Sequence, residues 1–284
     1  MPSTVCPQLK DNILVSAESH PASYPIIVHL REAPTPRDRT VRPDFVLIRN
    51  ECRGAAHTQD WKNSLFGLMF ANVPSVNTLS SVYSFLERPV VQGELNRLQA
   101  ELGPANFPVI QQQYFAGFQD MMYTNAFPCV VKLGHAHAGM GKMRVQDHHD
   151  FEDFRSIVVM SDGKYCTAEP FLDGEYDLRL QRIGPSHHRA YRRQSVSGNW
   201  KTNTGTSIIE EVQVTEEYRR WLDAAATMFG GLDICTVDAI HDRQTGKEVI
   251  IEVNGTSSGL APDNAVEDSG FIRDLVVEKM NVVL

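Results

Sequence analysis

The sequence predicts an α+β protein with two or three lobes arranged around a cleft. Two observations lead to this class. Between residues 44 and 102, short strand-like runs alternate with helix-like runs, which is typical of an α/β unit with a parallel sheet. After Pro104, strand-like runs dominate and only a few helices interrupt them, which favours antiparallel sheets. We therefore expect an amino-terminal α/β lobe followed by a larger α+β part.

The amino-terminal lobe begins with a segment that is hard to interpret. Residues 1–43 are interrupted by prolines, and only the apolar run Tyr24–Leu30 stands out. Asp44–Arg49 (DFVLIR) is typical of a buried strand. Asp60–Ala71 is typical of a helix, since its apolar residues recur near helical spacing at Trp61, Leu65, Leu68 and Met69.

The junction between the two parts contains a short strand and two helices. Pro74–Asn77 is the expected strand, and Thr78–Leu86 is the first expected helix. Val90–Leu102 is the second, and Pro89 separates the two because proline interrupts a helix.

The larger part contains a series of expected strands, which are Phe107–Tyr114, Phe127–Leu133, Lys142–Gln146, Tyr165–Leu172, Asp177–Ile183 and His188–Val196. A helix over Asp150–Met160 interrupts them. A second helix starts after Thr215, a good N-cap, and carries an apolar stripe of Tyr218, Trp221, Leu222, Ala225 and Phe229. Two strands and a final helix complete the prediction, namely Leu232–Ile240, Glu248–Val253 and Glu267–Met280.

Composition excludes several classes of protein. The 27 basic and 35 acidic residues give a net charge of −8, which argues against a general nucleic-acid or anionic-membrane binder. No apolar run approaches the length of a transmembrane helix, and the amino terminus has no apolar signal segment. The 5 cysteines are widely spaced, and Cys129, Cys166 and Cys235 lie in apolar runs. We expect buried thiols in a reducing compartment, and therefore a protein that is cytosolic or peripheral on a cytosolic face.

A glycine-rich segment is the first candidate ligand-binding feature. In VVKLGHAHAGMGK (130–142), an apolar strand carries Lys132, and a turn with three glycines leads to Lys142. Two cations beside an accessible backbone suit a polyphosphate. The spacing matches neither the P-loop nor the dinucleotide-binding motif. A glycine-rich hairpin with two surface lysines is the alternative.

Two acids and an amide form the second candidate feature. Asp238 lies within an apolar strand, and Glu252 and Asn254 lie two residues apart in the next one, so Glu252 and Asn254 share a face. If the two strands pair, Asp238 joins them, and the three oxygen donors suit Mg²⁺ or Ca²⁺. Alternatively, Asp238 and Glu252 lie at strand ends in solvent or pair with lysines.

Three further segments could contact a nucleotide. In Glu169–Leu172 (EPFL), Pro170 lacks an amide hydrogen, which leaves a free strand edge that could recognise adenine. The segment Leu178–Ile209 has no acid but several arginines, which offers a place for an anion. The polar loop Gly198–Gly205 adds Lys201 and Asn203. An ordinary edge strand, a solvated strand face and a surface turn are the respective alternatives.

Taken together, these segments resemble the ATP-grasp fold and, within it, the ATP-binding domain of the synapsins. The resemblance covers residues 44–284, and it is most specific at VVKLGHAHAGMGK (130–142) and SVSGNWKTNTG (195–205). It implies two α+β lobes that enclose a nucleotide cleft, over residues 77–284, preceded by a small pre-ATP-grasp α/β lobe over residues 1–76.

The resemblance also assigns roles to residues. It implies that Lys132 contacts the α- and β-phosphates, that Lys142 belongs to a mobile loop closing over ATP, and that Glu169–Leu172 contacts adenine. Lys201 and Asn203 would lie near the terminal phosphates. Asp238 and Glu252 match the family's two metal-coordinating acids, and synapsins are associated with Ca²⁺-dependent ATP binding.

Several positions depart from the family pattern. Arg88 stands where the resemblance implies an ATP-contacting lysine, and Asp238 stands where it implies glutamate. Asn254 replaces an apolar residue of the vertebrate synapsins, so that Asp238, Glu252 and Asn254 are similar to the metal set of ATP-grasp ligases such as the ribosomal-protein glutamate ligases. The first 43 residues do not match the usual start of the synapsin domain.

Two functions are compatible with these motifs. The resemblance implies an ATP-binding, non-catalytic protein on the cytosolic face of synaptic vesicles in the presynaptic terminal, which regulates vesicle clustering and neurotransmitter release. It further implies a homodimer or higher oligomer and contact with actin. The alternative is an ATP-dependent carboxylate–amine ligase that works through an acyl phosphate.

Overall fold

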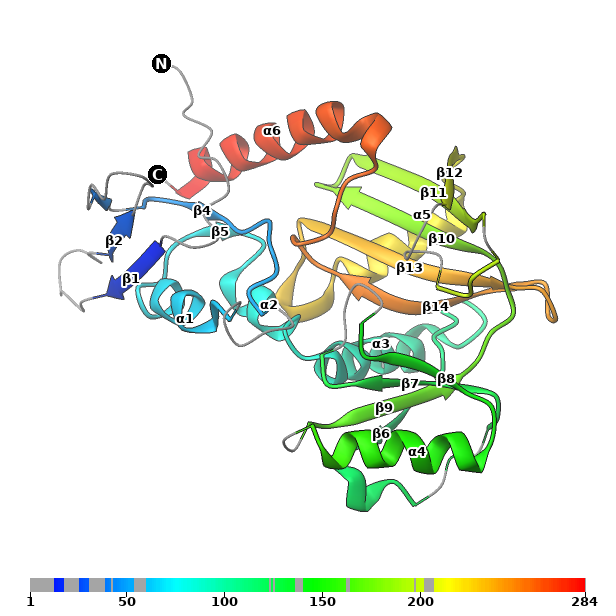
Figure 1. Cartoon of the computed structure of the whole chain (residues 1–284). Coiled ribbons are helices and arrows are strands. Elements are labelled where there is room, and N and C mark those ends of the chain that lie inside the picture. Colours follow the sequence, from blue (N-terminus) through cyan, green and yellow to red (C-terminus); the bar gives the residue numbers. More distant parts are fainter. Residues whose placement is uncertain are drawn as a thin grey trace.

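The computed structural model describes most of the chain, namely residues 13–17, 26–30, 39–41, 43–53, 60–122, 124, 126–135, 140–161, 164–196, 198–201 and 207–283. In this part of the chain, two large antiparallel sheets lie one above the other with a long helix between them, and a small amino-terminal part lies to one side (Figure 1). None of the described helices is long and apolar enough to cross a membrane.

The amino-terminal part contains two small sheets. An antiparallel sheet is formed by β1 (Ile13–Ala17), β2 (Ile26–Leu30) and β3 (Arg39–Val41). A parallel pair is formed by β4 (Val46–Leu47) and β5 (Ser75–Val76), and α1 (Lys62–Phe70) lies between them in sequence. The predicted parallel β–α–β arrangement is thus confirmed. Both strands are shorter than predicted.

Two helices lead from the amino-terminal part into the larger part. Helix α2 (Leu79–Ser84) is capped by the Thr78 hydroxyl, which accepts a hydrogen bond from the Ser81 amide. Helix α3 (Arg88–Leu102) begins one residue before Pro89, because the first turn of a helix tolerates a residue without an amide hydrogen. Arg88 is therefore the first residue of a helix, where its side chain can turn towards the neighbouring sheets.

The smaller of the two large sheets has the strand order β6-β9-β7-β8. Its strands are β6 (Gln113–Phe115), β7 (Cys129–Leu133), β8 (Lys142–Val145) and β9 (Cys166–Pro170). Helix α4 (His148–Val159) packs on it through Phe151, Phe154 and Val158.

The predicted strand Phe107–Tyr114 is largely wrong, since only its end belongs to β6. The Ile110 amide donates to the Ile250 carbonyl, and the Ile250 amide donates to Pro108, so the segment instead lies along the edge of the other sheet.

The larger sheet has five antiparallel strands in the order β12-β11-β10-β13-β14. They are β10 (Gly174–Ile183), β11 (His187–Ser195), β12 (Ser207–Val212), β13 (Ile234–Asp242) and β14 (Lys247–Asn254). The sequence did not predict β12. Its residues SIIEEV do not alternate, because Ile208, Ile209, Glu210 and Glu211 are all exposed on this edge strand.

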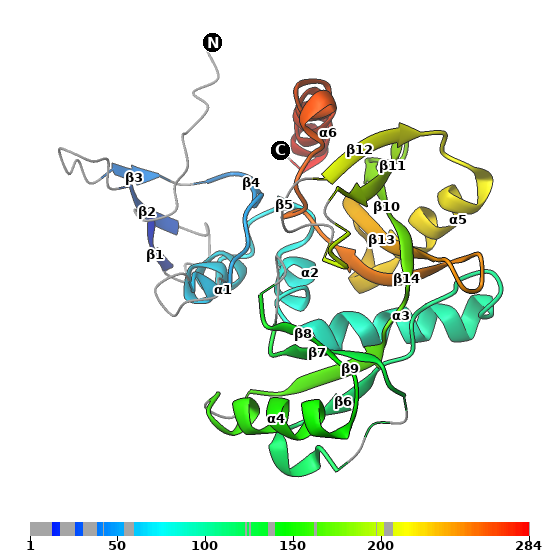
Figure 2. The same cartoon turned by 45° about the vertical axis from the view of Figure 1, so that its right-hand side comes forward.

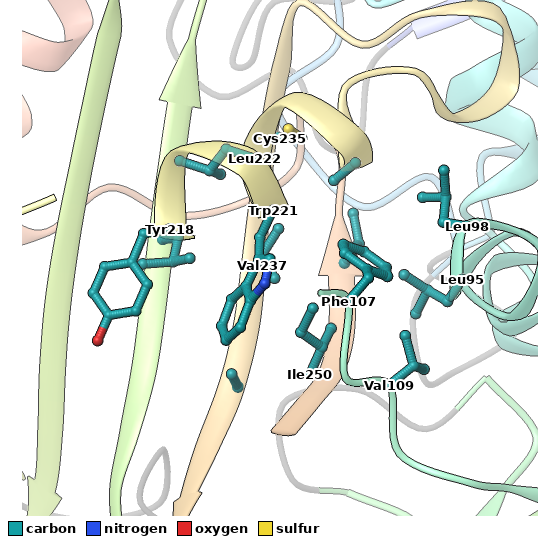
Figure 3. Packing of buried hydrophobic residues seen from close by; sticks show 14 of the residues in the cluster. Leu95, Leu98, Phe107, Val109, Tyr218, Trp221, Leu222, Cys235, Val237 and Ile250 are labelled. Atoms are coloured by element: carbon teal, nitrogen blue, oxygen red, sulfur yellow. The ribbon is translucent and has the colours of Figure 1, made fainter. Parts of the chain in front are cut away.

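One face of this sheet forms the main hydrophobic core. Helix α5 (Glu216–Ala225) lies across it, with Tyr218, Trp221 and Leu222 against Val237 of β13 and Ile250 of β14 (Figure 3). Helix α3 contributes Leu95 and Leu98 to the same core (Figure 3). The predicted N-cap is confirmed, since the Thr215 hydroxyl accepts a hydrogen bond from the Tyr218 amide.

The opposite face of the five-stranded sheet is covered at one end only. Helix α6 (Ala265–Val283) packs Ile272 and Leu275 against Ile183 and Ile234 there. Both views show α3 between the two large sheets (Figures 1 and 2). Short 3₁₀ turns complete the described structure, namely Phe118–Asp120, Met228–Gly230 and Pro262–Asn264.

The cysteines in the described residues behave as predicted. Cys129, Cys166 and Cys235 are buried free thiols, and burial raises the pKa of the Cys166 and Cys235 thiols to about 12. At neutral pH these thiols are therefore protonated and unreactive.

Candidate functional site

A cavity of about 320 Å³ opens between the two large sheets. Its described lining includes six cations and three acids, which are Arg53, Arg88, Lys132, Lys142, Arg179 and Arg193 against Glu51, Asp238 and Glu252. The cavity therefore carries an excess of positive charge in a chain whose net charge is −8. An anionic ligand is the chemical complement of such a cavity.

The four-stranded sheet supplies two of these cations from directly opposed positions. Lys132 of β7 and Lys142 of β8 are cross-strand partners, so both side chains point to the same face. Burial lowers the pKa of Lys142, and the like charges of Lys132 and Arg88 add to this effect, although Glu252 opposes it. Because these neighbouring cations repel one another, an anion bound between them would be attracted by each.

Lys132 is held by a buried ion pair. Its Nζ lies 2.6 Å from Oε2 of Glu169 on β9, and the two side chains are 5% and 8% exposed. Gln112 Nε2 donates to the same carboxylate oxygen at 2.7 Å. Glu169 is not among the described lining residues, but it lies on the same face of the sheet as Lys132, so the pair anchors the lysine at the cavity wall.

The turn between β7 and β8 requires glycine at both ends. Gly134 and Gly141 adopt φ values of +56° and +69°, which side chains with a Cβ rarely adopt. The Arg88 Nε donates to the His135 carbonyl at 2.8 Å, and the Lys201 Nζ donates to the Lys142 carbonyl at 2.7 Å. Two cations predicted to contact phosphate therefore hold the two ends of this turn. Residues 136–139 lie outside the described residues.

The five-stranded sheet brings together the predicted acids. Asp238 of β13 is the cross-strand partner of Glu252 of β14, and Asn254 follows on the same face. The Asn254 amide donates to Asp238 Oδ2 at 2.9 Å. All three residues line the cavity.

Each of the two acids faces an arginine. Arg88 Nη1 lies 2.8 Å from Glu252 Oε1, and Arg179 Nη1 lies 3.5 Å from Asp238 Oδ1. Burial alone would raise the pKa of Glu252, but Arg88, Lys142 and Lys132 together lower it to about 2. Burial raises the pKa of Asp238, and Arg179 only partly offsets this. The two carboxylates thus differ in their affinity for a proton, although they lie side by side.

The donor set fits a hard divalent cation. Two carboxylates and an amide oxygen are ligands that Mg²⁺ and Ca²⁺ accept. Among the described residues, no group of three or more His, Cys, Asp or Glu side chains could hold a metal ion. The protein by itself therefore offers an incomplete shell, and phosphate oxygens and water would have to complete it.

Within the described part of the chain, no strand pairs with the predicted adenine-contacting segment, residues 169–172, on the side away from β7, although the Leu172 carbonyl accepts a hydrogen bond from the Gly174 amide. Strand β6 pairs with Cys166–Ala168 of β9 and extends no further, whereas the Phe171 amide donates to the Pro128 carbonyl beyond β7. Along an extended strand, the backbone groups of successive residues point alternately to either side. Because the Phe171 amide points towards β7, the backbone groups of Pro170 and Leu172 point away from it. Trp200 packs edge-on against Phe171, and Lys201 lies over the Trp200 ring. Asn203 lies outside the described residues.

The basic segment Leu178–Ile209 divides between the two faces of its sheet. Arg179 and Arg193 reach the cavity. Arg189 and Arg182 instead pair with acids of the protein, and Arg192 stacks over Tyr176. Strand alternation sends Arg182 and Arg192 to the opposite face, whereas Arg189 shares the face of Arg179 and Arg193 but is paired with acids of α6, so only part of the segment is available to an anion.

Sequence reasoning missed several residues of the cavity lining. Glu51 and Arg53 come from the amino-terminal part, and Ser257–Gly259 follow β14. The Ser257 hydroxyl donates to Glu51 at 2.9 Å, and Arg49 Nη2 donates to the Ser258 carbonyl at 2.8 Å. Charged residues directly after a buried strand were the available signal, since the carboxyl ends of strands often border sites.

Two family descriptions match this chain. Residues 10–75 match the "Synapsin pre-ATP-grasp domain", and residues 77–282 match "Synapsin, ATP binding domain". The expectation that the first 43 residues depart from the family is therefore wrong from residue 10 onward. A Synapsin of Drosophila melanogaster is 36% identical over 248 residues, which cover 86% of this chain and 24% of that protein. This chain therefore spans about a quarter of the length of the curated relative that it matches.

Solved ATP-grasp proteins share the fold. The ATP-grasp ligase PsnB, complexed with a phosphomimetic variant of its minimal precursor, Mg and ADP, gives a TM-score of 0.62 at 18% identity, covering 94% of this chain and 86% of PsnB. A D-alanine–D-alanine ligase of Bacillus anthracis complexed with ATP gives a TM-score of 0.61 at 13% identity, covering 84% of this chain and 80% of the ligase. The predicted class, an α+β ATP-grasp fold, is confirmed. At these identities the likeness concerns the fold alone.

Proposed function

The chain belongs to the synapsin family, and on that premise we propose that its cavity binds ATP together with a divalent metal ion. One observation carries the proposal: six cations and three acids line a cavity of about 320 Å³ in a chain of net charge −8. A polyphosphate with a bound cation matches both the excess of positive charge and the presence of the acids. The volume is in the range of small-molecule sites.

The four-stranded sheet and Arg88 of α3 would contact the nucleotide. We assign Lys132, Lys142 and Arg88 to the phosphates, with Lys201 and Asn203 nearby, and the free edge of Glu169–Leu172 to the adenine. This division is supported by the position of the lysines on one sheet and of the free edge at the end of the same sheet. Arginine and lysine differ here, because the planar guanidinium of Arg88 can bind two oxygens at once.

Asp238, Glu252 and Asn254 would hold the metal ion. When bound, the ion supplies positive charge that offsets the phosphate charge. The protein's own contribution is a pair of acids at one register position and an amide two residues on. Ca²⁺ and Mg²⁺ both suit these oxygen donors.

Isothermal titration of ATP, with and without Ca²⁺ or Mg²⁺, tests this proposal. We expect metal-dependent binding that is lost in Lys132→Ala and in Glu252→Ala. Arg97→Ala is the matched control, because Arg97 is an exposed residue of α3 whose ion-pair partners among the described residues are Glu94 and Glu101 of the same helix. Metal-independent binding, or no binding by the unaltered protein, would contradict the assignment.

The family further suggests where such a protein acts. We propose that the chain associates with the cytosolic face of synaptic vesicles, forms a homodimer or higher oligomer, contacts actin, and takes part in vesicle clustering and neurotransmitter release. Sedimentation equilibrium with and without ATP measures the oligomer, and co-sedimentation measures binding to purified vesicles and to filamentous actin. A monomer that sediments with neither would limit the function to nucleotide binding.

A carboxylate–amine ligase is the second candidate. It is favoured by the Asp238, Glu252 and Asn254 donor set and by the extension of the cavity to Ser257–Gly259, where a second substrate would have room. Assays for ADP release in the presence of amino acids and peptides separate the two candidates. Steady turnover that depends on one such compound would favour the ligase, whereas ATP binding without turnover favours the non-catalytic protein.

A further inference from the structure

We infer that Arg88 couples metal binding to nucleotide binding by exchanging the Glu252 carboxylate for a phosphate oxygen. The inference rests on the proposed function and concerns how that same site is regulated. It assigns to Arg88 a positioning role besides its contact with the ligand.

Arg88 connects two parts of the cavity wall. Its Nη1 lies 2.8 Å from Glu252 Oε1 on β14, and its Nε donates to the His135 carbonyl at 2.8 Å. The two side chains of the ion pair are only 19% and 17% exposed, and both line the cavity. The guanidinium therefore holds a carboxylate of one sheet and the start of the glycine-rich turn of the other.

A metal ion on Glu252 competes with this ion pair. A divalent cation would bind the carboxylate at about 2.0–2.6 Å, so the ion and the guanidinium would be neighbours on one small group. Like charges at such a separation repel strongly, and more so where water is partly excluded. Metal binding at Glu252 therefore favours release of Arg88.

The released guanidinium stays in a cavity that is otherwise cationic. Lys132 and Lys142 line the same cavity, and its two other lining acids already have partners, since Arg179 lies 3.5 Å from Asp238 and Ser257 donates to Glu51. A phosphate of the nucleotide supplies oxygens that the planar guanidinium can bind in pairs. Each ligand thus makes binding of the other more favourable, and the coupling is necessarily reciprocal.

The other two ion pairs of the site differ from this one. Lys132 pairs with Glu169, which is neither among the described lining residues nor part of the proposed metal set. Arg179 lies 3.5 Å from Asp238, a longer contact, and its Nη2 also donates to the Ser258 hydroxyl. The Arg88–Glu252 pair is therefore the one that a metal ion must replace most directly.

Metal and nucleotide affinities of Arg88 variants test the inference. Mn²⁺ binding without nucleotide is measured by electron paramagnetic resonance, and ATP binding with and without Mg²⁺ by calorimetry. In the unaltered protein, we expect Mg²⁺ to tighten ATP binding at least tenfold, within the usual range of coupling between sites. In Arg88→Gln, we expect Mn²⁺ alone to bind about tenfold more tightly than in the unaltered protein. The ratio of the ATP dissociation constants without and with Mg²⁺ should fall towards one.

Arg97→Gln is the matched control, since it removes the same charge from the same helix at an exposed position. Unchanged Mn²⁺ affinity in Arg88→Gln, or an equal gain in Arg97→Gln, would overturn the inference. Arg88→Lys keeps the charge but not the planar set of donors. Its coupling between Mg²⁺ and ATP should therefore lie between that of the unaltered protein and that of Arg88→Gln. If the unaltered protein binds no ATP, the proposed function fails. If it binds ATP with metal dependence and Arg88→Gln retains that dependence, only the exchange fails.

Discussion

Two groups of charges lie on the same face of the five-stranded sheet and differ in how they are paired. Under α6, Arg189 contacts three acids, with Asp268 at 2.7 Å, Glu211 at 2.9 Å and Glu267 at 2.5 Å. Gln181 also donates to Asp268 at 2.6 Å. We call these residues the Arg189 cluster. At the open end of the face, the cavity has six cations for three acids.

The difference teaches how to separate structural charges from charges available to a ligand. In the Arg189 cluster the protein itself supplies an excess of acceptors, so the arginine is fully occupied in docking α6. In the cavity the cations outnumber the acids, so an external anion completes the site. Both groups contain arginines of the same basic segment, and only the number of partners distinguishes them. Three predictions follow from this contrast.

Asp268→Ala should have the largest effect on stability. Asp268 is 1% exposed and accepts from both Arg189 Nε and Gln181 Nε2, so its removal leaves these two donor atoms without their acceptor, although Arg189 keeps Glu211 and Glu267. We expect a loss of about 4 kcal/mol in the free energy of unfolding, measured with urea. ATP affinity of the folded protein should not change. Asp274→Ala is the control on α6, where the exposed pair with Arg273 should contribute less than about 0.5 kcal/mol. Equal losses in the two variants would show that the cluster is not structural.

Lys132→Met should affect both stability and ligand binding. The buried Glu169 would keep only Gln112 as a partner, and we expect a loss of about 3 kcal/mol. Adding Glu169→Gln should recover most of the stability but none of the ATP affinity, because the cation itself is missing. Urea unfolding and calorimetry measure the two quantities. Recovery of ATP binding in the double variant would exclude Lys132 as a phosphate contact.

Acid titration should show the smallest effect, with opposite signs for the two neighbouring acids. The pKa of Glu252 is lowered to about 2 in the folded protein. Its contribution to the free energy of unfolding is therefore present above the ordinary pKa of 4.5 and is lost as the pH falls towards 2. After allowance for screening, we expect about 2 kcal/mol. Glu252→Gln should remove this slope from the pH dependence of urea unfolding.

Asp238 provides the internal comparison. Burial raises the pKa of Asp238. Its contribution to the free energy of unfolding is therefore present below the ordinary pKa of 3.8 and is lost as the pH rises through the pKa of the folded protein. Asp238→Asn should therefore stabilise the free protein at neutral pH. A loss of stability there would contradict the expected sign.

Much of the fold could be predicted from local patterns. Helix α5 was evident because Thr215, Tyr218, Trp221 and Leu222 combine a cap with an apolar stripe, and both features depend on neighbours in sequence. Strand β12 was missed because exposed edge positions in SIIEEV carry no alternation. The segment Phe107–Ile110 is apolar, as a strand of the predicted sheet would be, yet it lies along Ile250 of the other sheet, which no local pattern indicates.

The sequence by itself determined most of the elements, the family and the residue types of the candidate site. Strand period placed Glu252 and Asn254 on one face, and the motif around Lys132 and Lys142 identified the synapsin family. Only the tertiary structure decided the partners of each charge. Arg179 and Arg189 look alike in sequence, but one reaches the cavity and the other lies under α6. Arg88 contacts Glu252 across a long stretch of chain. Ion pairs depend on which elements meet in space, and that depends on the packing of the whole chain.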